Sequence, residues 1–312
     1  MQQANRFIAV DWGASKLRAY CCEITTGNQL ILLNKATGIG VKQLVANFEQ
    51  TLETIIKPFT EQFGSLPVFM AGHITSSLGW LQTPYLACPI QPHQIKPQLL
   101  HFNGGDKDFY VTPGLCYQSE AQQHDTMRGE EIQLVGLLER YPQYRIGQYY
   151  VCLPGTHCKW VKVENGAVTW IKTAITGELF EILVHHSMLL QTSHSPFVPD
   201  KQSFTAGMQY ALEHRSENLV HSLFSVRTSQ LFQDFSAQAA QSYLSGLLIT
   251  ADVISFYNLC AEAILANIPV ILVGSGHLQC AYASAISQFT NPLVQIDDEE
   301  VILAGFAYMA GN

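Results

Sequence analysis

The pattern of apolar and polar residues predicts the same order of strands in each half of the chain. Each half opens with an apolar strand, passes through a turn of small residues to a second strand, and reaches a third through a polar turn. In the second half that polar turn contains Asn165-Gly166, a pair typical of β-hairpins. The six predicted strands are residues 6–11, 17–24, 29–34, 148–153, 159–163 and 167–173. Their repeated order predicts an internally duplicated α/β protein.

Segments with helical spacing of apolar residues fill most of the remaining chain. They are residues 41–58, 130–141, 178–190, 204–214, 218–232 and 237–266. Pro58 is expected to end the first of them, because proline has no amide hydrogen to continue a helix. The last predicted elements are a buried strand, a helix, a short strand and a helix, at residues 270–273, 277–289, 293–296 and from 298 onward.

Length and composition narrow the class of protein. A chain of 312 residues usually forms two domains, and we place them at residues 1–145 and 146–312, since the second strand set follows Pro142. A net charge of −8 disfavours nucleic acid and anionic membranes as partners.

No apolar run reaches about 18 residues and no signal peptide is visible, so we expect a cytoplasmic protein. The eight cysteines include no CxxC pair, which argues against a disulfide framework or a zinc site.

The turn after the first strand carries residues suited to phosphate and metal. A carboxylate at a strand end, as in Asp11, can hold a water bound to Mg²⁺, and it is the predicted metal residue. Gly13 permits a tight turn that presents backbone amides, while Ser15 and Lys16 can donate to phosphate oxygens. Read alone, the same residues would form an ordinary hairpin turn.

The corresponding turn of the second half strengthens the phosphate interpretation. Gly155, Thr156 and His157 follow the strand at 148–153, so two small-residue turns occupy equivalent places. A third turn, Gly274-Ser275-Gly276, lies between a buried strand and a helix, where a nucleotide can approach the backbone. A single GxG is weak by itself, and a turn without a ligand is an equally good interpretation of it.

Two segments of the first half are candidates for contact with the substrate. Glu130 and Glu131 open a predicted helix, where acidic residues commonly complement the helix dipole; one of them could instead accept a proton from a substrate hydroxyl. Arg128 beside them could bind a carboxylate in a bidentate manner. Gly72 and Ser76 lie in a segment of small and hydroxyl residues that could bind a polyol or could be a plain αβ loop.

Taken together, these segments resemble the 2-dehydro-3-deoxygalactonokinase family of the actin/hexokinase superfamily. The motifs that carry the resemblance are DWGxSxLRA at 11–19, MAGxxxSxxGW at 70–80, MRGEExQLxG at 127–136, PGTHCKWV at 154–161 and TGEL at 176–179. Together with PGL at 113–115, FTAG at 204–207 and the segment at 243–249, these motifs run from residue 10 to about 276, essentially the whole chain. DWG is shared across the superfamily, whereas PGTHCKWV and MRGEE are more specific. Pro154 departs from the superfamily pattern, because an aspartate commonly occupies that position.

The resemblance implies a fold of two duplicated actin-like, ribonuclease H-like domains with an active-site cleft between them. It implies transfer of the γ-phosphate of ATP, with Mg²⁺, to the 6-hydroxyl of 2-dehydro-3-deoxy-D-galactonate in galactonate catabolism. Residues 1–145 would form the sugar-acid and phosphate side, and residues 146–312 the nucleotide side. Glu130 aligns best with the catalytic base of sugar kinases, with Glu131 and Asp125 as rivals. Arg18, Arg128 and Lys159 are candidates for binding the substrate carboxylate.

Other functions remain open at this point. Another kinase of the same superfamily, acting on an amino sugar or a different keto acid, would share most of these motifs. A sensor that binds ATP and a sugar acid without turnover would share them as well. The expected partners are small molecules, and the sequence allows a homodimer without determining the oligomeric state.

Overall fold

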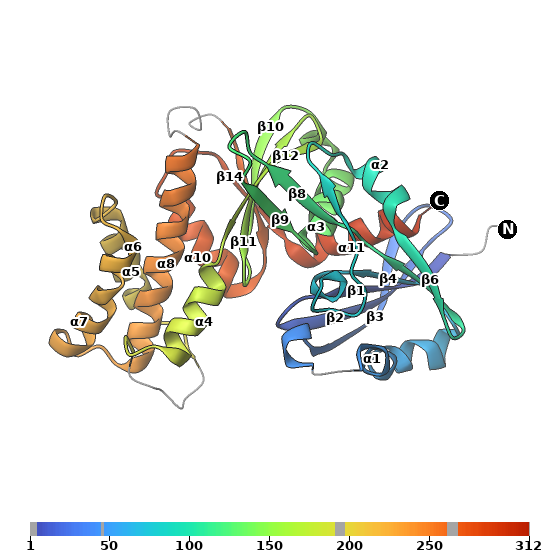
Figure 1. The fold of residues 1–312 in the computed structure, drawn as a ribbon, viewed down its shortest axis with the longest axis horizontal. Helices are drawn as coiled ribbons and strands as arrows, with labels where there is room; N and C mark the ends of the chain where they lie inside the picture. Colours follow the sequence, from blue (N-terminus) through green and yellow to red (C-terminus); the bar gives the residue numbers. More distant parts are fainter. Residues whose placement is uncertain (1–4, 45–46, 191–196, 261–267, 312) are drawn as a thin grey trace. The chain divides into compact units, whose positions relative to one another are not determined.

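The computed structural model describes residues 5–44, 47–190, 197–260 and 268–311 (Figure 1). The chain divides into two compact units. Unit 1 comprises Met1–Tyr149, Val161–Lys172 and Asp297–Asn312, and unit 2 comprises Tyr150–Trp160 and Thr173–Ile296. The division of the chain at residue 145 stays a prediction. Among the described residues, no helix is long and apolar enough to span a bilayer.

Unit 1 contains a six-stranded sheet with the order β3-β2-β1-β4-β7-β6. Its strands are β1 (Asn5–Trp12), β2 (Lys16–Ile24), β3 (Leu30–Ile39), β4 (Val68–Ala71), β6 (Leu100–Gly104) and β7 (Lys107–Val111). β1 and β2 are antiparallel, whereas β1 and β4 run parallel, so both Asp11 and Ala71 lie at the same end of the sheet. A separate three-stranded sheet, which the sequence pattern did not predict, contains β5 (Tyr85–Ala87), β8 (Gly114–Gln118) and β9 (His124–Met127).

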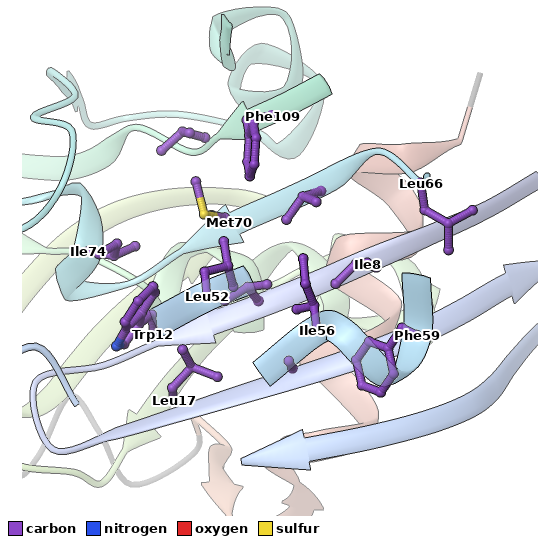
Figure 2. Packing of buried hydrophobic residues seen from close by; sticks show 14 of the residues in the cluster. Ile8, Trp12, Leu17, Leu52, Ile56, Phe59, Leu66, Met70, Ile74 and Phe109 are labelled. Carbon is purple, nitrogen blue, oxygen red and sulfur yellow. The ribbon is translucent and has the colours of Figure 1, made fainter. Parts of the chain in front are cut away.

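The main core of unit 1 lies between the six-stranded sheet and α1 (Phe48–Phe63). Figure 2 shows Leu52, Ile56 and Phe59 of α1 beside the apolar side chains of the strands. The prediction that Pro58 ends this helix was wrong, because the helix continues to Phe63. Pro58 itself is exposed while Phe59 is buried, so packing of the next residue holds the helix past the missing hydrogen bond.

Two longer helices complete unit 1, together with several short ones. The longer helices are α3 (Glu130–Arg140) and α11 (Asp298–Ala310), which pack closely on each other. The short helical segments are η1 (Val41–Gln43), η2 (His73–Thr75), α2 (Pro92–Ile95), η3 (Lys96–Gln98) and η4 (Pro142–Arg145).

The second sheet has the order β12-β11-β10-β13-β14. Its strands are β10 (Gln148–Leu153), β11 (Cys158–Glu164), β12 (Ala167–Ala174), β13 (Val270–Gly274) and β14 (Leu293–Asp297). β10 and β13 are parallel, as are β1 and β4 in the first sheet. Both sheets therefore place their strands in the order third, second, first, fourth, which confirms the predicted duplicated α/β fold.

Helices make up most of unit 2 (Figure 1). They are α4 (Thr176–His186), α5 (Lys201–Glu213), α6 (Leu219–Ser222), α7 (Phe224–Phe232), α8 (Ala237–Leu259) and α10 (Gly276–Ile286). α8 is buried along most of its length and packs against α4, α5, α7 and α10. The predicted continuation of this helix to residue 266 extends beyond the described residues, since 261–267 lie outside them.

Candidate active-site segments

Asp11, the second-last residue of β1, lies in an ion-pair network. Arg18 lies opposite Asp11 on β2, and its Nε donates to Asp11 Oδ2 at 3.0 Å, with Nη2 2.7 Å from the same oxygen. Its Nη1 donates to Oδ2 of Asp298, the first residue of α11, at 2.7 Å. Burial raises the pKa of Asp11, and the positive charge of Arg18 acts in the opposite direction. Arg18 therefore orients Asp11 and joins it to the start of α11.

The hairpin turn between β1 and β2 is supported from the segment that follows β3. Gly13 donates its amide to Lys16 O at 2.9 Å, so this amide serves the hairpin itself. Val41 N donates to Gly13 O at 3.1 Å, and a Cβ at Gly40 would stand only 2.3 Å from the carbonyl oxygen of Ala14. Ser15 and Lys16 are exposed at the tip of this supported turn.

Three backbone segments meet at the carboxyl end of β1. A Cβ at Gly72 would lie 2.6 Å from Trp12 O, and a Cβ at Gly129 would lie 2.9 Å from the Cα of Gly72. Both glycines have a positive φ, 105° and 109°, which residues with a side chain rarely adopt. The contacts place the end of β1, the end of β4 and the start of α3 together. Asp11 and Glu130, each one residue from this meeting point, therefore belong to one region of unit 1.

The two glutamates at the start of α3 have different surroundings. Glu131 is fully buried; its Oε1 accepts from Thr112 Oγ1 at 2.8 Å and its Oε2 from Gly129 N at 2.6 Å. Burial, and then the charge of Glu130, raise the pKa of Glu131 to about 7. Glu130 is partly exposed and its Oε2 accepts from Arg128 N at 3.0 Å. Glu131 thus holds the loop before α3, while Glu130 is accessible.

Arg128 is held by contacts to hydroxyl and aromatic groups. Its Nη1 donates to Thr75 Oγ1 at 2.7 Å and to Thr83 Oγ1 at 2.5 Å, and its Nη2 donates to Thr83 O at 2.9 Å. Its Nε donates to Tyr85 OH at 3.4 Å, and the guanidinium lies over the Tyr85 ring, 4.3 Å from the centroid. These contacts account for four of the five N–H groups that an arginine carries.

The remaining predicted residues of unit 1 are Ser76, which follows η2, and Asp125, which lies in β9. The Ser76 hydroxyl accepts from Leu78 N at 3.2 Å. Asp125 lies in β9, paired with Tyr117 of β8, and its Oδ1 accepts from Thr126 N at 2.9 Å. Asp125 is therefore on a strand of the small sheet, whereas Glu130 is at the start of a helix.

In unit 2, the turn of residues 154–157 packs against the start of α4. A Cβ at Gly177 would lie 2.4 Å from Gly155 O, and Glu178 N donates to Thr156 O at 2.9 Å. His157 Nε2 lies 2.7 Å from Glu178 Oε2. The turn is therefore fixed both by its backbone and by the ring of His157.

The Gly274–Gly276 turn lies beside the same segment. An ideal Cβ at Gly274 would be 3.8 Å from Pro154 Cδ, and Gly276 begins α10 with a φ of 58°. Ser275 is exposed at this turn.

Lys159 is only 5% exposed, and its Nζ donates to Thr173 Oγ1 at 3.1 Å. No group of three or more His, Cys, Asp or Glu side chains suited to a metal occurs within the described part of the chain.

Several of these residues were not identified by the sequence analysis. Asp298 bonds to a residue 280 positions away, so no local pattern could have revealed it. Thr75 and Thr83 are buried hydroxyl residues, and the run of small polar residues after β4 was the only local indication of the first. Glu178, in contrast, lies in the TGEL motif of the family resemblance, which opens α4 next to the predicted phosphate-binding turn of residues 155–157.

Known proteins are similar to this chain over nearly its whole length. A family model described as 2-keto-3-deoxy-galactonokinase matches residues 11–309. The 2-dehydro-3-deoxygalactonokinase of Escherichia coli (strain K12) is 31% identical over 306 residues, which cover 98% of this chain and 97% of that protein. A protein of Rhizobium meliloti (strain 1021), named a probable 2-dehydro-3-deoxygalactonokinase, is 30% identical over 317 residues and 99% of this chain, covering 98% of its own length. A crystal structure from Sinorhizobium meliloti, assigned as a 2-dehydro-3-deoxygalactonokinase, superposes with a TM-score of 0.80 at 28% identity, covering 97% of this chain and 98% of that one.

Proposed function

Since the chain belongs to the 2-keto-3-deoxy-galactonokinase family, we propose that it transfers the γ-phosphoryl group of ATP to the 6-hydroxyl of 2-dehydro-3-deoxy-D-galactonate. One structural observation carries the assignment of roles. The contact of Trp12, Gly72 and Gly129 brings a carboxylate at a strand end and a carboxylate at a helix start into one region. Phosphoryl transfer depends mainly on such positioning and on charge neutralisation. Residues 1–145 are the sugar-acid and phosphate side in this proposal, and residues 146–312 the nucleotide side.

Glu130 is the proposed catalytic base. Its partly exposed carboxylate can accept the proton of the substrate hydroxyl as the oxygen bonds to the γ-phosphorus and the bond to ADP breaks. Glu131 is less suited to this role, because it is fully buried and both of its oxygens accept hydrogen bonds from Thr112 and Gly129. Asp125 is less suited because it lies in β9, outside the start of α3.

Asp11 is the proposed contact to Mg²⁺, and its surroundings fit that ion. Both contacts from Arg18 reach Oδ2, and the described residues place no donor on Oδ1. A single carboxylate oxygen, completed by waters and phosphate oxygens, is a common arrangement for Mg²⁺. When bound, the ion would offset the charge of the phosphates. Arg18 fixes the orientation of the carboxylate, and Ser15 and Lys16 supply donors from the exposed tip of the turn.

The nucleotide side of the proposal rests on the turns of unit 2. Gly155, Thr156 and His157 would face the phosphates of ATP, and Gly274 to Gly276 would contact the adenosine. The support for this is that Gly274 and Pro154 are neighbours, and that no described atom from elsewhere in the chain lies within 4 Å of an ideal Cβ at Gly276, which leaves the backbone there open to a nucleotide. Because Pro154 supplies no carboxylate, metal contact rests on Asp11 in this proposal.

Arg128 is the best-placed candidate for the substrate carboxylate. Arg18 is already paired with two carboxylates, and Lys159 is almost fully buried against Thr173. Arg128 is held rigidly, and it keeps one N–H group beyond its contacts within the described structure. It would therefore offer one charge-assisted hydrogen bond, rather than the bidentate pair that its sequence context first indicated.

A coupled ADP-release assay with Mg²⁺-ATP tests the proposal. The substrates are 2-dehydro-3-deoxy-galactonate, 2-dehydro-3-deoxy-gluconate, glucose and N-acetylglucosamine, assayed with wild type, Glu130→Gln, Glu131→Gln and Asp125→Asn. We expect turnover of the galactonate derivative, lowered about 10²-fold or more only by Glu130→Gln. Turnover of a neutral sugar would point to another kinase of the superfamily. ATP binding without turnover of any substrate would favour the sensor.

A further inference from the structure

Asp252 is a carboxylate buried near the middle of α8. It is 8% exposed, and within the described structure it accepts hydrogen bonds from three neutral side chains. Trp160 Nε1 donates to Oδ1 at 3.0 Å, while Thr176 Oγ1 and Tyr282 OH donate to Oδ2 at 2.9 and 2.7 Å. Burial raises the pKa of Asp252, and the bonds from Tyr282, Trp160 and Thr176 oppose that change. A buried carboxylate with three donors is well satisfied, so removing it leaves three polar groups without their acceptor.

The three donors lie on the elements that carry the nucleotide side of the proposed site. Trp160 is on β11, which begins directly after the turn of residues 154–157. Thr176 is the first residue of α4, and Tyr282 is on α10, which follows the Gly274–Gly276 turn. The side chain of Asp252 on α8 thus accepts hydrogen bonds from β11, α4 and α10.

The hydrogen bond from Thr176 connects Asp252 to the turn of residues 155–157. The next two residues of α4 are in contact with the turn, since Gly177 packs on Gly155 O and Glu178 N donates to Thr156 O at 2.9 Å. Glu178 also holds His157 at 2.7 Å. A change in the position of Thr176 therefore moves the groups that set the conformation of residues 155–157.

We propose that Asp252 is a positioning residue for binding of the ATP phosphates, acting through Thr176 and the start of α4 on the turn of residues 155–157. This inference rests on the proposed function, because it assumes that this turn faces the phosphates. Asp252 does not contact the nucleotide; its effect is on the affinity for ATP and not on recognition of the sugar acid.

The test compares Asp252→Asn and Thr176→Val with wild type. Thr176→Val removes one of the three bonds and keeps the carboxylate, so it stays informative if Asp252→Asn folds poorly. The Kd for ATP is measured by calorimetry without sugar acid, KM for each substrate by the coupled assay, and Tm by thermal unfolding. Tyr243→Phe is the matched control: it lies on α8 too and loses a hydroxyl that bonds Ser225 at 3.1 Å.

We expect both variants to weaken ATP binding, Asp252→Asn by about tenfold and Thr176→Val by less, with KM for the sugar acid within about twofold. Tyr243→Phe should leave the Kd for ATP unchanged. A lower Tm with an unchanged Kd for ATP in both variants would mean that Asp252 is only structural, and would overturn the inference. If wild type binds ATP but turns over no sugar acid, the proposed function is overturned, while the Kd for ATP can still be compared between wild type and the variants. A wild type that does not bind ATP overturns both.

Discussion

Gly136 of α3 lies directly against the backbone of Val301 in α11, so close that a Cβ at Gly136 would stand 1.7 Å from the Val301 carbonyl oxygen. The contact is reciprocal, because a Cβ at Gly305 of α11 would stand 2.1 Å from Ile132 O. The two helices begin with residues of the candidate site, Glu130 on one and Asp298 on the other. Close backbone packing of α3 on α11 therefore fixes the separation of these two groups within unit 1.

Gly136→Ala should destabilise the protein by about 2–3 kcal/mol, because the added methyl group can be accommodated only by moving one helix away from the other. Urea unfolding measures the change. Gly27→Ala is the control, since the nearest atom to its Cβ would be Thr25 Oγ1 at 3.8 Å, and it should change the free energy of unfolding by less than about 0.5 kcal/mol. Equal effects of the two substitutions would contradict the packing argument.

Arg18→Met should lower both stability and kinase activity. The substitution leaves Asp11 and Asp298 without their shared cation, and we expect a loss of about 2 kcal/mol, less than for a fully buried pair because Arg18 is 24% exposed. The free energy of unfolding and the dependence of activity on Mg²⁺ concentration measure the two effects. Arg6→Met removes the more exposed pair with Glu23 between the same two strands and should cost less than about 1 kcal/mol. If Arg6→Met lowers the free energy of unfolding as much as Arg18→Met does, the network around Asp11 has no special role.

Glu131→Gln should remove a pH dependence of stability between about pH 4.5 and pH 7. The folded protein holds the Glu131 proton up to a pKa of about 7, above the unfolded value of 4.5, so its stabilising contribution is complete at low pH and is lost as the pH rises. Relative to the glutamine variant, wild type should lose up to about 3 kcal/mol across this window. Urea unfolding of both proteins at pH 5, 6, 7 and 8 measures the difference. Glu61→Gln, at an exposed site, controls for the substitution itself, and a pH-independent difference for Glu131→Gln would refute the prediction.

Glu178→Gln should raise KM for ATP about threefold to tenfold, because a neutral amide holds the His157 ring less firmly beside the phosphate turn. KM for the sugar acid should stay unchanged, and steady-state kinetics with each substrate varied separately measures both values. Glu181→Gln is a matched control on the same helix, where the glutamate is 66% exposed and pairs with His185 at 3.4 Å. The role of Glu178 would be in doubt if the control raised KM for ATP equally.

Local patterns were sufficient to predict the repeated strands of the two sheets. The strand at 148–153 agrees with β10, because a short apolar run between turn residues has few alternative structures. The small sheet was missed because its strands have three to five residues and mixed exposure, so that no alternation is visible. The end of α1 was misplaced because burial of Phe59 outweighs the local effect of Pro58.

The residues named for the candidate site could be found from motifs, but their partners could not. The contact of Arg18 with Asp298 and that of Trp160 with Asp252 join residues 280 and 92 positions apart, and pairing over such distances depends on the whole fold. Asp252 did leave one local sign, since it is the one charged residue in the 23-residue helix α8. A charge in such an apolar segment requires buried partners, although the sequence does not say which.

The position of α11 in the chain has a consequence for synthesis. This helix belongs to unit 1, yet residues 173–296 of unit 2 precede it. A ribosome therefore synthesises all the residues of unit 2 before it makes the helix that packs on Gly136 and pairs with Arg18. During translation, α3 lacks this packing partner and exposes an apolar face to water. We expect unit 2 to become protected from proteolysis first in stalled nascent chains, and unit 1 only after residue 310 has left the exit tunnel.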